Sequence, residues 1–152
     1  MFDMIRNGEF YSVWSKGTAL YVRWANVQGI GYPELMVLYA MKTKDRLTQK
    51  EIGEGYGLLK QTVNTVIRDL KARGYITLEP SKEDKREKLL SFTQEGEQYA
   101  FRMVEPLLCA EERVCKRIEY ERMEQLQDIM ELFNLLFERE VTDHAGKNGQ
   151  DE

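Results

Sequence analysis

A run of short polar side chains in the middle of the chain could form hydrogen bonds with the edges of DNA bases. These side chains are Gln61, Thr62, Asn64 and Thr65, in a segment predicted to be helical from about residue 59 to 73. Glutamine and asparagine can pair bidentately with adenine, and threonine can hydrogen-bond to a base or contact the thymine methyl group. An ordinary amphipathic helix with a polar solvent face would show the same pattern, so these residues alone leave both interpretations open.

A second group of residues could contact the DNA backbone and the minor groove. Lys60 and Arg68 are placed for phosphates, whose contacts fix register without reading sequence. In the charged segment 82–88, Lys85 and Arg86 could approach a narrow A·T-rich minor groove, where the potential is most negative. Asp84 could pair with Arg86 and hold it extended. A solvated charged loop without a partner is the alternative.

The residue sets that enzymes and metal sites need are missing from the sequence. The single histidine, His144, lies in a polar stretch near the end of the chain, and the two cysteines, Cys109 and Cys115, provide too few further ligands for a zinc site. No Ser/His/Asp or Cys/His set and no phosphate-binding glycine loop is present. We therefore expect no enzyme, no metal and no cofactor. The cysteines are interpreted as reduced packing residues, with a redox-sensing thiol as the alternative.

The elements that would position the polar groups have recognisable ends. Thr48 and Glu51 have the spacing of a capping box, which predicts a short helix to about Glu54, followed by a tight turn at Gly55 and Gly57. The helix over 59–73 has apolar residues on its opposite face and ends before Gly74. Alternation over 75–79 and a second apolar run over 89–92 then predict a β-hairpin, whose loop is the charged segment.

Long apolar helices are predicted on both sides of this region. Residues 3–27 form one, and five of the aromatic residues there and in the helix opened by Pro33 could line an effector pocket or form dimer core: Tyr11, Trp14, Tyr21, Trp24 and Tyr39. After Thr93 the chain is helical again, and Pro106 should kink or break the helix near Val104. A heptad-like stripe predicts a dimer seam at Met123, Leu126, Met130, Phe133 and Phe137.

Composition and charge favour a soluble protein with a basic centre. The 152 residues are 42% hydrophobic and 32% charged, no apolar run approaches a membrane span, and no signal peptide is recognisable, so a cytoplasmic location is expected. The net charge is −4, yet residues 42–88 hold twelve basic and eight acidic side chains, a net +4, which leaves −8 for the rest. A basic segment between acidic ends is typical of a DNA-contacting module.

Several stretches together resemble the multiple antibiotic resistance regulator (MarR) family. They are Leu47 to Glu54, Leu58 to Leu70, Arg73-Gly-Tyr-Ile, Asp84-Lys-Arg-Glu and Phe92-Thr-Gln-Glu-Gly. The similarity is continuous from about Pro33 to Gly96. Two departures are Leu59, where the family generally has a serine cap, and Gly53, where it usually has alanine.

The resemblance implies a homodimer whose first and last helices interlock, with a winged domain on each side that binds a palindromic operator, usually as a repressor. It implies that Arg86 is the minor-groove arginine with Asp84 as its partner, that Gln61, Thr62 and Thr65 fall on the base-reading face, and that a small aromatic ligand releases the DNA. The redox-sensing branch of the family uses a cysteine near the N-terminus, and here none precedes Cys109.

The sequence thus predicts a mainly α fold with a small β-hairpin wing (α+β), a winged helix-turn-helix with N- and C-terminal dimerisation helices. The expected divisions are a dimerisation helix over 1–30, the DNA-binding domain over 31–96, dimerisation helices over 97–141 and a disordered tail over 142–152. The partners expected are double-stranded DNA, a second copy of the chain and a small aromatic ligand, with no membrane. A winged-helix module that binds a protein instead of DNA is the alternative.

Overall fold

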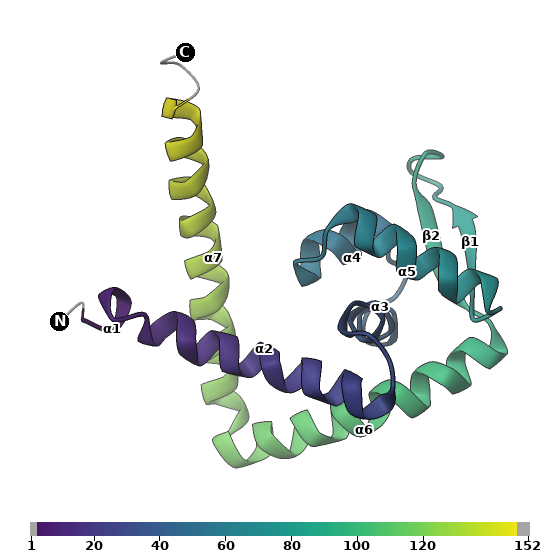
Figure 1. Cartoon of the computed structure of the whole chain (residues 1–152), viewed down its shortest axis with the longest axis horizontal. Helices are drawn as coiled ribbons and strands as arrows, with labels where there is room; N and C mark the ends of the chain where they lie inside the picture. Colours follow the sequence, from purple (N-terminus) through teal and green to yellow (C-terminus); the bar gives the residue numbers. More distant parts are fainter. Residues whose placement is uncertain (1–2, 149–152) are drawn as a thin grey trace. The chain divides into compact units, whose positions relative to one another are not determined.

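The computed structural model describes residues 3–148 and divides the chain into two compact units, up to Leu108 and from Cys109 onward. The first unit contains α1 (Asp3–Arg6), α2 (Glu9–Gln28), α3 (Tyr32–Thr43), α4 (Gln49–Tyr56), α5 (Lys60–Ala72), β1 (Ile76–Pro80), β2 (Lys88–Phe92) and the first part of α6 (Gln94–Ile118). The second contains the end of α6 and α7 (Tyr120–Asn148). This order confirms the predicted mainly helical fold with one two-stranded hairpin (Figure 1).

The core of the first unit forms around α3, which is covered by the elements that follow it. Leu35, Val37 and Leu38 are fully buried, and the inner face of α5 packs into the same cluster through Val63, Ile67 and Leu70. Pro33 lies in the first turn of α3, where a missing N–H leaves no helical bond unmade. Because α5 buries a complete face in this core, its opposite face is left in solvent.

The turn between α4 and α5 is fixed at both ends of α4. The capping box at Thr48 is formed: the Glu51 amide donates to Thr48 Oγ1 at 3.2 Å, and the Thr48 amide donates to Glu51 Oε2 at 2.7 Å. The helix continues two residues beyond the expected end, so Gly55 lies inside it. Gly57 alone makes the turn, with a φ of 63° that favours glycine.

The hairpin is an antiparallel pair in which Ile76 faces Phe92 and Leu78 faces Leu90. The residues before α4 extend it, because Leu90 N–H donates to the Leu47 carbonyl at 3.0 Å and Thr48 forms a β-bridge with Leu89. The wing is therefore joined to the start of α4 by backbone hydrogen bonds as well as to α5 by the chain. Figure 1 shows the hairpin beside α4 and α5 with its loop projecting away from them.

Two helix boundaries predicted from the sequence are wrong. The first helix does not run unbroken from Asp3, because Gly8 has a φ of 71° and separates α1 from α2. The break expected near Val104 is absent, because α6 continues through Pro106. Proline has no N–H to donate to the Arg102 carbonyl four residues earlier. Both residues are exposed, so this carbonyl can bind water instead. The chain breaks instead at Glu119, whose φ of 81° is rare for a residue with a side chain.

The tail predicted as disordered over 142–152 is helical as far as Asn148, and residues 149–152 lie outside the described part. Extending an existing helix gains one hydrogen bond for each residue that is fixed, and no proline occurs there to stop it. Among the helices that the structure describes, none is long and apolar enough to span a bilayer.

Candidate nucleic-acid interface

The outer face of α5 presents most of the predicted base-reading side chains to solvent. Gln61, Asn64 and Thr65 are exposed and Thr62 is half-buried, while the inner face is held in the core. Helix α5 starts at Lys60 after Leu59, whose side chain makes no capping hydrogen bond. A helix anchored on one face and polar on the other meets the geometric requirement for insertion into a major groove.

A groove of about 670 Å³ separates this helix from the hairpin and α4. Four cationic side chains line it, together with the polar residues Gln49 and Asn64 and the acidic residues Glu54 and Glu87: Lys50, Lys60, Arg86 and Lys88. They come from α4, α5 and the wing, segments up to 38 residues apart in the sequence. The sequence predicts roles for Lys60, Asn64 and Arg86. It predicts none for Lys50 and Lys88, since nothing in their spacing shows that α4 and β2 face α5.

A second, shallower groove of about 490 Å³ lies along the other side of α5. Gln61, Thr62 and Thr65 line it with Leu59, and the start of α3 forms its other wall. Helix α5 therefore separates the predicted base-reading residues: Asn64 faces the wing, and the other three lie toward α3. Leu59 lines the same groove, although the sequence does not predict it as a base-reading residue.

The hydrogen-bonding capacity of Thr65 is partly used within its own helix. Its hydroxyl donates to the Gln61 carbonyl at 3.0 Å. The hydroxyl oxygen can still accept a bond, and the side-chain methyl remains available for apolar contact. Thr65 therefore presents an acceptor and a methyl group.

The predicted Asp84–Arg86 pair exists in a different form. The Asp84 carboxylate accepts a hydrogen bond from the Arg86 backbone N–H at 2.9 Å, as in an Asx turn. This contact shapes the wing loop through the backbone, because the carboxylate binds the peptide group at position 86. The Arg86 side chain lines the cationic groove instead. Lys85 and Arg68 are exposed, and neither lines the two grooves described above.

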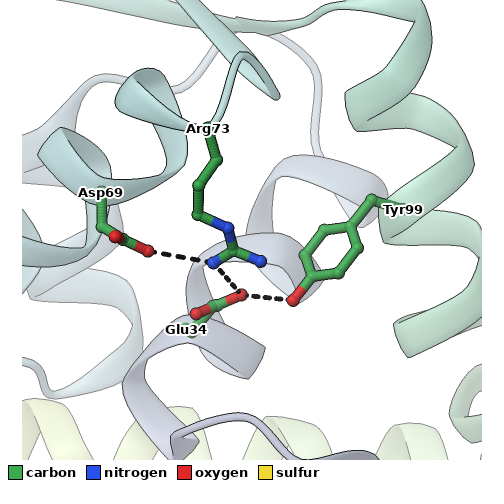
Figure 2. Close-up of polar contacts among 4 residues, drawn as sticks. All are labelled: Glu34, Asp69, Arg73 and Tyr99. Atoms are coloured by element: carbon green, nitrogen blue, oxygen red, sulfur yellow. Dashed lines mark hydrogen bonds and ion pairs between the residues drawn. The ribbon is translucent and has the colours of Figure 1, made fainter.

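The C-terminal end of α5 is anchored by a polar cluster of four residues (Figure 2). Arg73 bonds to Glu34 of α3 at 3.0 Å and to Asp69 of α5 at 2.9 Å. The Tyr99 hydroxyl of α6 donates to the same Glu34 oxygen at 2.6 Å. The guanidinium carbon also lies 4.9 Å from the ring centres of Tyr75 and Tyr99, which stack on each other at 4.4 Å. Three helices and the residue before β1 thus meet at one arginine.

The cluster shifts the proton affinity of two of its members. Burial by itself lowers the pKa of Arg73, but contacts with Asp69, Tyr99 and Glu34 outweigh it, so that the pKa lies above its usual value. Burial, followed by the hydrogen bond to Glu34, raises the pKa of Tyr99 to about 12. Arg73 therefore stays charged, and Tyr99 stays a hydrogen-bond donor, throughout the physiological pH range.

The five aromatic residues proposed for an effector pocket are not in one place. Tyr21 and Tyr39 meet edge to face at 6.5 Å, and Tyr39 does the same with Tyr56 at 6.3 Å. Trp24 is half-buried and donates its indole N–H to the Met103 carbonyl at 3.0 Å. Tyr11 and Trp14 lie further toward the N-terminus of α2, and Tyr11 is 75% exposed.

The predicted dimer seam lies on α7, in the second unit. Met123, Met130 and Phe133 are half-buried, whereas Leu126 and Phe137 are exposed. The rings of Phe133 and Phe137 stack with centroids 5.5 Å apart. Further apolar side chains widen the exposed surface of this helix: Ile129, Leu132, Leu135 and Leu136.

Comparisons with known proteins show which family the chain resembles. A model of the MarR family matches residues 28–87, which include α3, α4, α5 and β1. The solved structure of a MarR family regulator from Neisseria meningitidis is similar along the whole length, with a TM-score of 0.79 and 26% identity; the match covers 95% of this chain and 99% of that one. The chain is therefore similar to MarR-family regulators, in sequence over residues 28–87 and in fold over 95% of its length.

Two further MarR-type proteins are similar over different lengths. The organic hydroperoxide resistance transcriptional regulator of Bacillus subtilis (strain 168) is 33% identical over 67 residues, which are 44% of this chain and 46% of that protein, so the match spans less than half of the relative's length. A Staphylococcus aureus MarR, solved in complex with salicylate and kanamycin, shares the fold at a TM-score of 0.59 and 22% identity, over 88% of this chain and 92% of that one.

These matches confirm the predicted resemblance to MarR-family regulators. The fold is that of a MarR-family transcription regulator, and the matched proteins are regulators rather than enzymes, in agreement with the prediction that the chain is not an enzyme.

Proposed function

We propose that this protein is a MarR-type, homodimeric, sequence-specific DNA-binding regulator that represses transcription and is released from its operator by a small molecule. The observation that carries the proposal is the meeting of four cationic side chains, from α4, α5 and the wing, on one groove beside the exposed polar face of α5. Backbone phosphates require such cations, and base edges require such a polar helix face.

The roles of the residues follow from their places around α5. Gln61, Thr62, Asn64 and Thr65 read bases in the major groove, and Lys60 binds phosphate together with Lys50, Lys88 and Arg68. Arg86 of the wing enters the adjacent minor groove, with Lys85 near the backbone and Asp84 holding the loop through its amide bond. A dimer would place two such units on DNA about one helical turn apart, which predicts an inverted-repeat operator.

The proposed effector is a small aromatic molecule. The S. aureus MarR named above was solved with salicylate, and this chain has tyrosines gathered at the contact between α2, α3 and α4. Release of bound DNA by added salicylate, followed by fluorescence anisotropy, tests this part separately. DNA binding that is unaffected by salicylate would remove this ligand from the proposal and leave the DNA-binding proposal in place.

The central experiment is a selection of bound duplexes from a random DNA pool at about 0.15 M salt. We expect an inverted repeat whose half-sites are about one helical turn apart. Weak binding without a consensus, in ligand-stripped protein, would contradict the proposal and favour a winged-helix module that binds a protein.

The wing is tested with Arg86→Ala on the selected operator. Affinity should fall about tenfold or more, because one specific arginine contact is worth about 1–3 kcal/mol. Lys82→Ala is the matched control, since it removes the same charge from an exposed position of the same loop that does not line the cationic groove. Equal affinities of the two variants would remove Arg86 from the mechanism.

A further inference from the structure

Leu59 occupies an unusual place for an exposed apolar side chain. It lies immediately before α5, and 77% of it is accessible to solvent. Single exposed leucines are common on protein surfaces and need no explanation by themselves. This one, however, stands at the end of the helix that the proposed function inserts into the major groove, next to Lys60 and Gln61.

The Leu59 side chain has no stabilising role in the free protein. As the residue before the helix it contributes its carbonyl, which accepts from Val63 N–H at 3.0 Å, but its side chain makes no capping bond. Serine, threonine, aspartate or asparagine at this position would cap the helix and stabilise it. The side chain is also outside the buried core, whereas its neighbour Leu58 packs against that core.

The surroundings of Leu59 distinguish the two sides of α5. The cations line the groove on the wing side, whereas the groove lined by Leu59 holds Pro33, Val66 and two carboxylates, Glu34 and Asp69. Both carboxylates are bonded to Arg73. Since no lysine or arginine lines that side, a phosphate would find no cationic side chain there. An apolar contact with a base edge fits it better.

Thymine is the base with a matching group, because its C5-methyl is the apolar feature of the major groove. The N-terminal residues of the second helix in a helix-turn-helix are those that contact base edges. We propose that Leu59 is a specificity-determining residue that contacts the methyl group of one thymine in each half-site of the operator. This inference rests on the proposed DNA-binding function and adds a base preference to it.

The test removes the methyl group and the leucine separately and together. Each thymine of the selected operator is replaced in turn by deoxyuridine, symmetrically in both half-sites, and binding of wild type and Leu59→Ala is measured by fluorescence anisotropy. Burial of one methyl-sized group is worth about fourfold in affinity, so a dimer should lose about 15-fold when both methyls are absent. In Leu59→Ala, the loss of affinity caused by deoxyuridine should disappear at one thymine position. It should persist at any other thymine whose methyl group contacts the protein.

Two control variants accompany these binding measurements. Leu59→Met keeps an apolar side chain of similar size and should retain the penalty at the same thymine. Gln61→Ala removes a neighbouring polar group and should leave that penalty unchanged.

The outcomes separate this inference from the proposed function. If the wild type selects an operator but Leu59→Ala shows the same deoxyuridine penalties, or if no thymine methyl contributes, the inference about Leu59 is wrong and the DNA-binding function stands. If the wild type shows no sequence preference at all, both are wrong. A penalty that depends on Leu59 at one thymine establishes the contact.

Discussion

Gly96, in the first turn of α6, lies against the backbone of the residue that precedes β1. A Cβ atom at this position would be 1.8 Å from the Tyr75 carbonyl oxygen and 2.7 Å from its carbon, far inside contact distance. The same turn is held by Thr93, whose Oγ1 accepts from the Gly96 N–H at 3.0 Å and donates to the Gly74 carbonyl at 2.6 Å. The glycine allows α6 to start directly on the chain between α5 and the wing.

Gly96→Ala should therefore destabilise the protein severely. The atoms that the new methyl would meet belong to the backbone and cannot rotate away, so we expect a loss of about 3 kcal/mol in the free energy of unfolding. Urea denaturation measures it, with the denaturant slope unchanged if the variant still unfolds in one step.

Gly55→Ala is the matched control for this substitution. Gly55 lies inside α4 with open space around its missing Cβ, so alanine should stabilise the protein by up to about 1 kcal/mol through helix propensity. Equal midpoints for Gly96→Ala and the wild type would show that α6 does not approach Tyr75 this closely.

At the scale of the elements, the cluster around Arg73 links the end of α5 to α3 and α6. Its tyrosine gives the link a pH dependence. Tyr99 has a pKa of about 12 in the folded protein against 10.0 for an unperturbed tyrosine. Since the folded state holds the proton more tightly, the stability that the protonated hydroxyl contributes is complete below pH 10 and is lost as the pH rises from 10 toward 12.

Tyr99→Phe tests this contribution because it keeps the ring stacked on Tyr75 and removes the hydroxyl. Below pH 10 the wild type should be more stable than the variant, and the difference should shrink as the pH rises toward 12. Urea unfolding at several pH values measures the difference, in which the titration of the other tyrosines and lysines cancels. Tyr75→Phe removes a hydroxyl from the other ring of the stacked pair and is the control for loss of a ring hydroxyl. A constant difference for Tyr99→Phe would show that its hydroxyl is not held in this way.

The elements were predictable from the sequence where local chemistry determines them. Thr48 and Glu51 formed the expected capping box, Gly74 has the positive φ expected after a helix, and the change from helical to alternating spacing located the hairpin. The sequence-based predictions of helix ends failed where solvent exposure or a backbone angle decides whether the helix continues. Proline rules predicted a break near Pro106, but exposure of that turn allows the helix to continue, and the real break at Glu119 has no sequence signal.

The candidate site was predictable in its residue types but not in its arrangement. Spacing along α5 identified Gln61, Asn64 and Thr65 because one helix carries them all. That Asn64 and Gln61 face different grooves depends on where the wing and α3 lie, and these long-range contacts leave no local pattern. The same holds for Arg73, whose partners Glu34 and Tyr99 are 39 and 26 residues away in the sequence.

At the scale of the whole molecule, charge and apolar surface are segregated along the chain. The net positive charge lies within residues 42–88, whereas α7 exposes large apolar side chains along most of its length. Exposed apolar surface of this extent marks an interface. A second copy of the chain fits it, because a dimer would both cover α7 and supply the second DNA-reading unit that an inverted repeat requires.

Phe133→Glu should therefore convert the proposed homodimer into a monomer. Phe133 is half-buried, stacks on Phe137 and lies at the centre of the apolar stripe, so a carboxylate there would have to be desolvated in the dimer without a partner. Sedimentation measures the mass, and the monomer should bind the operator far more weakly because it engages one half-site at a time.

Gln125→Glu introduces the same side chain at an exposed position of α7 outside the stripe and should remain dimeric. If Phe133→Glu sediments as a dimer, the subunits associate through another surface, and the exposed apolar residues of α2, Val13 and Leu20 among them, become the next to substitute.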